Sequence, residues 1–147
     1  MNVKIRALIV STVAVALPVV LATPSEAATI GSRALVVAGN QVNDPYQYGA
    51  AGPNRFDCSG LTQYAFKSVG KQLPRTAAQQ LNATAPVSAS QRQPGDLVFF
   101  GSPVYHVGIY AGNGKIWNAN TGSYRGRRVV LAPISEYGGT VRYGRVR

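Results

Sequence analysis

The chain contains very few of the residues on which most protein sites depend. Among 147 residues there is one cysteine, Cys58, one histidine, His106, and five acidic residues. A single cysteine excludes an internal disulfide, and one histidine with so few carboxylates offers no ligand spacing for a metal. Glycine-rich loops of the P-loop or dinucleotide-binding type are absent from the sequence. We therefore expect no metal and no cofactor.

The first residues have the pattern of an export signal. Lys4 and Arg6 precede an apolar run over residues 7–21, and small residues follow it. This order predicts a secretory signal peptide over residues 1–27, cleaved after Ala27 or after the next alanine. A membrane anchor is the weaker alternative, because the run is shorter than the ~20 residues that a spanning helix needs. We therefore expect a secreted protein, extracellular or associated with the cell wall.

The charge of the exported chain is strongly positive. Without residues 1–27, 13 basic and 4 acidic residues remain, a net charge of about +9. Such a balance predicts contact with an anionic polymer, although it could also serve solubility alone. Export argues against nucleic acid as the partner, and the basic segment 122–128 has one aromatic residue, too few for a stacking platform. We interpret that segment as a solvated loop or a contact with anionic wall polymer.

The order of the expected elements predicts the fold class. Helices are expected first, over residues 32–42, from Cys58 to a stop at Gly70, and over 76–81 behind the cap Thr76. Strands are then expected over residues 97–100, 106–111, 115–119, 128–132 and 140–146, with a hairpin turn at Gly112-Asn-Gly. Residues 28–147 are therefore predicted to form one α+β domain, in which N-terminal helices pack on an antiparallel sheet of about five strands.

Cys58 stands at the expected start of the second helix. Free backbone amides and the helix dipole stabilise an anion at that position, so the pKa of the thiol should fall. The alternative is a small buried apolar residue, which is the commoner role of a lone cysteine. Its position, and the lack of a partner cysteine in an exported chain, favour a nucleophile.

A nucleophilic cysteine needs a base, and His106 is the one candidate. It opens an expected strand, where it could form an imidazolium–thiolate pair with Cys58 or be an ordinary strand histidine. The hairpin brings Asn118 back level with His106, which would allow the amide to orient the ring, although Asn120 and Thr121 remain candidates. Together Cys58, His106 and Asn118 form the Cys-His-Asn version of a catalytic triad.

Several motifs of the sequence together resemble the NlpC family of bacterial cell-wall cysteine endopeptidases. The resemblance runs from about Ala34 to Val146. The motifs are Asn43-Asp-Pro-Tyr-Gln-Tyr-Gly, Gly52-Pro-Asn-Arg-Phe-Asp-Cys-Ser-Gly-Leu, Leu73-Pro-Arg-Thr-Ala, Pro94-Gly-Asp-Leu-Val-Phe-Phe and His106-Val-Gly-Ile-Tyr-Ala-Gly-Asn-Gly.

The resemblance implies a papain-like fold and a function. The family cleaves peptidoglycan stem peptides, typically between D-glutamate and the following diamino acid, through a thioester. The resemblance implies that Cys58 is the nucleophile and His106 the base. Asn118 falls at a position where many members carry a second histidine. Tyr46 is implied to line the oxyanion site. Asp57 and Ser59 are implied to shape the substrate pocket, with helix capping and solvation of the first turn as their local alternatives.

The resemblance leaves other functions open. A related amidase would cut between sugar and peptide, and a catalytically weak protein would only bind the wall. An antibacterial toxin with the same chemistry would cut a competitor's wall. In each case the expected partners are peptidoglycan stem peptides and, through the basic surface, anionic wall polymers, with the protein acting as a monomer.

Overall fold

The computed structural model describes residues 28–147. The predicted signal peptide, residues 1–27, lies outside these described residues. Within residues 28–147, no helix combines the length and the apolar character that crossing a membrane requires.

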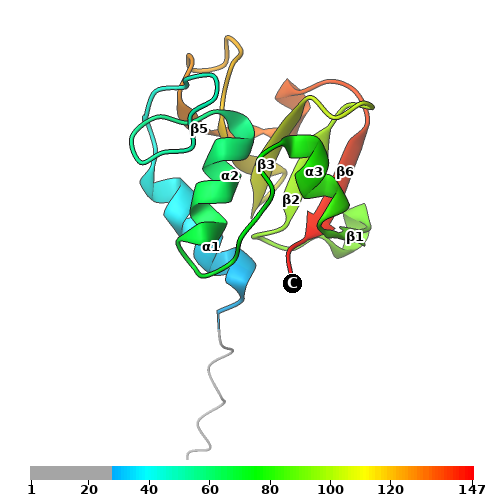
Figure 1. Ribbon diagram of the computed structural model, residues 1–147. Helices are drawn as coiled ribbons and strands as arrows, with labels where there is room; N and C mark the ends of the chain where they lie inside the picture. Colours follow the sequence, from blue (N-terminus) through cyan, green and yellow to red (C-terminus); the bar gives the residue numbers. More distant parts are fainter. Residues whose placement is uncertain (1–27) are drawn as a thin grey trace, which may run out of the picture.

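The chain runs from helices into a sheet, as Figure 1 shows. All neighbouring strands are antiparallel, in the order β1-β6-β2-β3-β4-β5. The predicted α+β fold, with helices ahead of an antiparallel sheet, is therefore confirmed. The elements are α1 (Ile30–Asn40), α2 (Cys58–Lys67), α3 (Ala77–Asn82), β1 (Ala85–Val87), η1 (Ala89–Gln91), β2 (Leu97–Phe100), β3 (His106–Gly112), β4 (Lys115–Ala119), β5 (Val129–Pro133), η2 (Ile134–Glu136) and β6 (Val141–Arg145).

The sheet has six strands where about five were expected. The additional strand, β1, is three residues long and pairs with β6 from Ala85↔Arg145 to Val87↔Tyr143. It contains Pro86, which lacks an amide hydrogen and is tolerated only at a sheet edge. So short a segment with a central proline has no alternating pattern, and only its contact with β6 makes it a strand.

The first helix is shifted by two residues from the predicted range 32–42. The hydroxyl of Thr29 accepts a hydrogen bond from the Ser32 amide at 3.0 Å and so caps the helix earlier than expected. The helix ends at Asn40, and Val42, which was placed on its apolar face, is 46% exposed.

The second helix begins at Cys58 as predicted but ends at Lys67. Ser68, which was assigned to its buried face, is exposed, whereas Phe66 is fully buried. The third helix is capped by Thr76 as predicted, and Gln79 completes a capping box with it.

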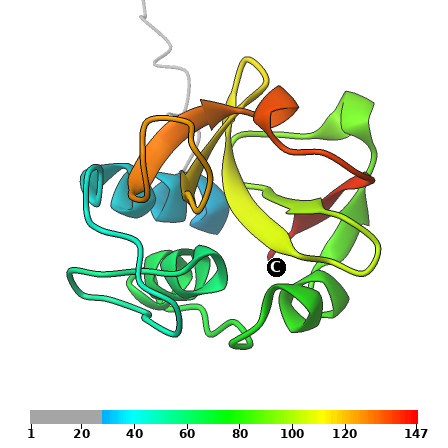
Figure 2. The ribbon, with the colours of Figure 1, turned by 90° about the horizontal axis from the view of Figure 1, so that it is seen from above.

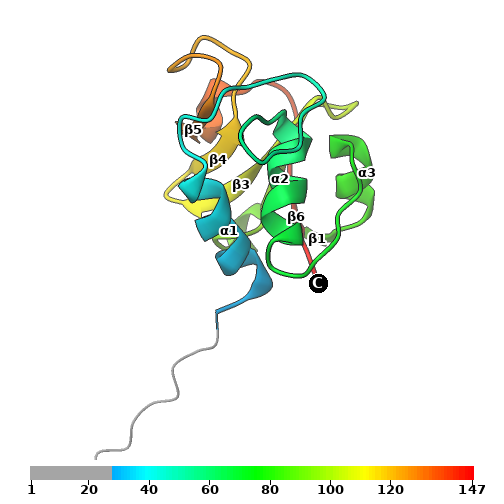
Figure 3. The same cartoon turned by 60° about the vertical axis from the view of Figure 1, so that its left-hand side comes forward.

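The sheet is buried on both faces. Figures 1 and 3 show α1 and α2 side by side against one face, where Phe99, Val107 and Ile109 form the core with small residues of the helices. On the other face, Phe100 and Tyr110 pack beneath the chain that follows β5, and Figure 2 shows η2 on the side of the strands opposite α2. Burial on both faces explains why Leu97-Val-Phe-Phe is uninterruptedly apolar.

The start of α2 is packed directly against the preceding loop. A Cβ atom at Gly60 would lie 2.1 Å from the carbonyl oxygen of Ala50. That same carbonyl accepts a hydrogen bond from the Asp57 amide at 2.8 Å. The glycine two residues after Cys58 therefore permits the loop to lie across the first helical turn.

Replacing Gly60 with alanine should destabilise the fold. The added methyl group meets backbone rather than a flexible side chain, so the loop or the helix must move, at a cost of about 1–3 kcal/mol. Chemical denaturation measures this loss. Gly138→Ala is the matched control, because a Cβ at Gly138 meets open space, and equal stability of the two variants would contradict the packing argument.

Candidate active site

Cys58 and His106 face a common cavity of about 240 Å³. The cavity lies where the start of α2 and the start of β3 meet the segments after β4 and β5. Within residues 28–147, no group of three or more His, Cys, Asp or Glu side chains could hold a metal ion. The lining residues are Tyr46, Cys58, Tyr105, His106, Asn120, Thr121, Gly122, Ser123, Tyr124, Glu136 and Tyr137.

The predicted fall in the pKa of Cys58 is wrong. Burial raises the pKa of this thiol, and the neighbouring Asp57 carboxylate raises it further. Backbone amides, including those of Ser59 and Val107, lower the pKa but do not outweigh these two effects. At neutral pH the resting group is therefore a thiol rather than a thiolate.

His106 is buried in its neutral form. His106 is 3% exposed, and this burial lowers the pKa of its imidazole to about 4. The hydrogen bond to Asn118 raises the pKa, but by less than burial lowers it. In the described part of the chain, Asn118 is the one hydrogen-bond partner of the ring. The resting pair is thus thiol and neutral imidazole, not the ion pair considered from sequence.

Asn118 is the polar residue that the hairpin brings to His106. Its Oδ1 lies 3.0 Å from His106 Nε2, and its Nδ2 donates to the carbonyl of Val130 at 3.3 Å. The second bond fixes the amide so that its oxygen faces the ring, and Nε2 must then carry the hydrogen. Nδ1 is left as the basic nitrogen of His106.

The backbone register makes this contact possible. β3 and β4 pair through Ile109↔Trp117, so Asn118 comes opposite Gly108 on the same face as His106. A Cβ at Gly108 would lie 3.2 Å from the Cβ of Asn118. The glycine therefore leaves room for the amide to reach along the strand to His106.

Tyr137 completes the surroundings of His106, and no sequence pattern indicated this role. Its ring stacks on the imidazole at 4.5 Å between centroids and 18° between planes. Its hydroxyl donates to Asn118 Oδ1 and lies 3.0 Å from Asn120 Oδ1. Tyr137 thus holds the imidazole plane from one side and the orienting amide from another.

Asn120 and Thr121, the alternatives to Asn118, have other positions. The Asn120 side chain bonds to the backbone of the following loop, including the Gly122 amide at 3.0 Å and the Gly126 carbonyl at 3.2 Å. Thr121 is exposed at the edge of the cavity. Asn120 therefore shapes the cavity wall, while Asn118 contacts the imidazole.

Asp57 and Ser59 lie beside the cavity rather than in its lining. The Asp57 carboxylate caps α2 by accepting from the Gly60 amide at 2.7 Å, and it pairs with Arg75 at 2.6 Å. Ser59 accepts from the same arginine at 3.0 Å. Asp57 therefore caps the helix and Ser59 packs beside Arg75, and the role of both residues toward substrate stays a prediction.

Tyr46 lines the cavity near Cys58. Burial is the main cause that raises the pKa of its hydroxyl, followed by the charges of Cys58 and Asp57, so the group is a hydrogen-bond donor at neutral pH. The Arg127 guanidinium lies 5.2 Å from the ring centroid. Its contribution to an oxyanion site stays a prediction.

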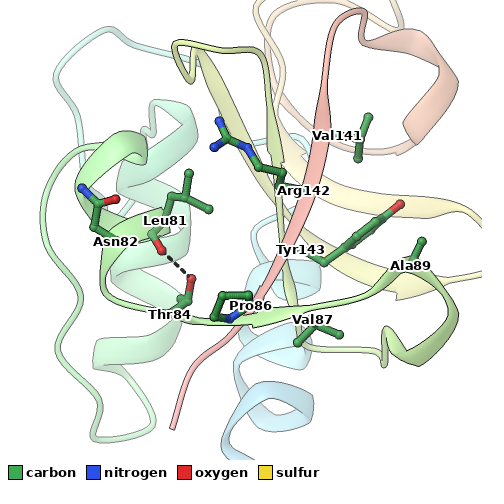
Figure 4. A pocket seen from close by; sticks show the side chains of 9 residues that line it. All are labelled: Leu81, Asn82, Thr84, Pro86, Val87, Ala89, Val141, Arg142 and Tyr143. Carbon is green, nitrogen blue, oxygen red and sulfur yellow. Dashed lines mark hydrogen bonds between the residues drawn. The ribbon is translucent and has the colours of Figure 1, made fainter.

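A larger cavity lies elsewhere, between α3, β1 and β6. It measures about 580 Å³, and Figure 4 shows its lining side chains, among them Leu81 from α3 and Arg142 from β6. Neither Cys58 nor His106 lines this cavity. Size alone would therefore point to the wrong place, and the residues with nucleophilic and basic chemistry identify the smaller cavity.

The buried imidazole should make the fold sensitive to mild acid. His106 takes up a proton near pH 6.5 when unfolded but only near pH 4 when folded, so the unfolded state binds more protons between these values. The free energy of unfolding should then fall, by up to about 3 kcal/mol, as the pH is lowered through this window. Urea unfolding at several pH values measures this fall in the protein and in His106→Gln, in which only the carboxylates titrate over this range. The same pH dependence in both proteins would show that His106 is not its source.

Comparisons with known proteins identify the family of the chain. A model of the NlpC/P60 family matches residues 43–138. A probable endopeptidase of Corynebacterium glutamicum strain R is 41% identical over 120 residues, which cover 82% of this chain and 53% of that protein. The bifunctional muramidase/DL-endopeptidase CwlT of Bacillus subtilis strain 168 is 48% identical over 82 residues, which cover 52% of this chain and 25% of that protein.

A solved structure extends the similarity to the fold. RipD of Mycobacterium tuberculosis, described as a non-catalytic NlpC/p60 domain protein adapted to peptidoglycan binding, is 28% identical with a TM-score of 0.69. The match covers 82% of this chain and 99% of RipD. The chain spans about half the length of the C. glutamicum protein and a quarter of CwlT. Since the family model covers well over half of the chain, the protein belongs to the NlpC/P60 family, which includes peptidoglycan hydrolases and endopeptidases.

Proposed function

We propose that the protein is an exported cysteine endopeptidase that cleaves the stem peptides of peptidoglycan, with residues 28–147 as its single catalytic domain. One observation carries the proposal: Cys58 and His106 line the same cavity, and Asn118 Oδ1 holds the imidazole through its Nε2 atom. The names of the relatives, which include endopeptidases and a DL-endopeptidase, support the reaction class.

The proposed reaction starts from the neutral pair. Nδ1 of His106 takes the thiol proton as Sγ of Cys58 attacks the amide carbonyl, and the C–N bond of the tetrahedral intermediate then breaks. Backbone amides at the start of α2 and the Tyr46 hydroxyl would donate to the oxyanion. The imidazolium gives its proton to the leaving amine, and water hydrolyses the thioester with His106 again as base.

The proposed bond lies between D-glutamate and the diamino acid that follows it. The DL-endopeptidase activity in the name of CwlT supports this choice over the amidase alternative. A wall-binding role without catalysis has a precedent in RipD. Cys58 and His106 are both present here in one cavity, and this favours the enzyme.

Export and wall contact complete the proposal. The pattern of residues 1–27 supports secretion, and the excess of basic residues supports attraction to anionic wall polymers. Exposed arginines, Arg125, Arg127 and Arg128, lie in the loop that continues from the cavity wall, so this attraction would act close to the site.

A digest tests the reaction and the nucleophile together. We expect the protein to cut peptidoglycan and defined muropeptides after D-glutamate, and Cys58→Ala to lower kcat by at least about 10³-fold, because the thiol forms the covalent intermediate. Mass spectrometry of the products identifies the bond. Release of whole stems from the sugar would mean an amidase, and retained binding without cleavage would mean a wall-binding protein.

Wall binding should weaken steeply with salt. Between about 0.1 and 1 M salt the Debye length falls from about 10 to 3 Å, so attraction through exposed arginines is largely screened. Sedimentation of Cys58→Ala with isolated walls, over a range of salt concentrations, measures the effect without digestion. A double variant, Arg125→Gln with Arg128→Gln, should reduce the salt dependence more than the equally charged control Lys67→Gln with Lys71→Gln; binding that salt leaves unchanged would contradict the idea.

A further inference from the structure

Glu136 is an unusual acidic residue in this basic protein. Residues 28–147 contain four acidic side chains, and two of them are paired: Asp57 with Arg75 at 2.6 Å and Asp96 with Arg145 at 2.8 Å. Glu136 forms no ion pair within the described residues, and it lines the cavity that holds Cys58 and His106. Asp44 also forms no ion pair there but lies outside the cavity, so Glu136 is the carboxylate without an ion pair among the lining residues.

The charge of the cavity lining follows from this residue. The lining contains no lysine or arginine, His106 is neutral, and Asp57 lies outside it. Glu136 is therefore the one side chain among the described lining residues that is charged at neutral pH. Burial is the main cause that raises the pKa of the neighbouring Tyr137 hydroxyl, and the charge of Glu136 adds to it. A positively charged substrate group would be attracted there.

The position of Glu136 indicates which part of the substrate it meets. In the proposed reaction the acyl part stays on Cys58, and the amine leaves from the side of His106, which protonates it. Glu136 directly precedes Tyr137, whose ring lies flat on the imidazole. The carboxylate is therefore on the leaving side of the cleaved bond.

We propose that Glu136 is a specificity residue that receives the cationic side chain of the residue following the cleaved bond. This inference rests on the proposed function and deepens it: the free ω-amine of the diamino acid is a recognised group, and stem peptides whose ω-amine is acylated are poorer ligands. Because the glutamate is solvent-exposed, the gain is that of an accessible ion pair, about three- to fivefold in affinity.

Binding measurements separate this inference from the reaction itself. The probes are L-Ala-γ-D-Glu-L-Lys and its diaminopimelate counterpart, each with a free and with an N-acetylated ω-amine. They are titrated calorimetrically into the full chain carrying Cys58→Ala, so that no probe is cleaved. We expect the free forms to bind about three- to fivefold more tightly, and Glu136→Gln to abolish this preference while leaving the acetylated forms unchanged.

A charge control and a parallel digest complete the test. Asp44→Asn changes the net charge equally outside the cavity and should keep the preference for the free amine. Equal binding of the free and acetylated forms, or a preference that survives Glu136→Gln, overturns the proposal. Digestion of the same probes by the protein with Cys58 intact reports separately on the proposed function, so that failure of one is distinguishable from failure of the other.

Discussion

The carboxylate of Asp57 is the interaction on which the site depends. It accepts from the Gly60 amide at 2.7 Å and the Gly49 amide at 3.0 Å, and it pairs with Arg75. These bonds tie together the loop before α2, the first turn of α2 and the segment that leads to α3. Asp57 is the more buried partner, with a side chain 12% exposed against 36% for Arg75, so loss of the arginine would leave a largely buried carboxylate without its counter-ion. The cap at Asp57 thus sets the start of the helix and with it the position of Cys58.

The same carboxylate opposes the nucleophilic role that we propose for Cys58. Partial burial, and after it the charge of Asp57, disfavour the Cys58 thiolate, while burial keeps His106 neutral. The helix start alone would have lowered the pKa of the thiol, but desolvation is the larger effect here. A neutral resting pair has a consequence for the proposed reaction: the thiol proton would move to His106 as the bond to the substrate carbonyl forms. The ring must then be correctly oriented beforehand, and Asn118 and Tyr137 provide that orientation.

Local signals in the sequence predicted those features that depend on neighbouring residues. The cap at Thr76, the helix start at Cys58 and the hairpin from His106 to Asn118 each follow from a short pattern, and all three are present. What could not be predicted depends on distant contacts. β1 exists only through β6, and Tyr137 reaches His106 only because the chain after β5 folds back over the sheet. The pKa of Cys58 was mispredicted for the same reason, since burial is a property of the whole fold.

The surroundings of His106 bear on the choice between catalysis and wall binding alone. A protein that only holds peptidoglycan needs a cavity of suitable shape and charge, for which a buried titratable ring is a disadvantage, since its protonation opposes folding. Here the ring is buried, stacked on Tyr137 and bonded through one nitrogen, so that its other nitrogen is left basic. Each of these features restricts the base to one tautomer and one orientation, and proton transfer is the process that benefits from both. The cost in acid stability is therefore understandable for an enzyme and has no use in a passive binding site.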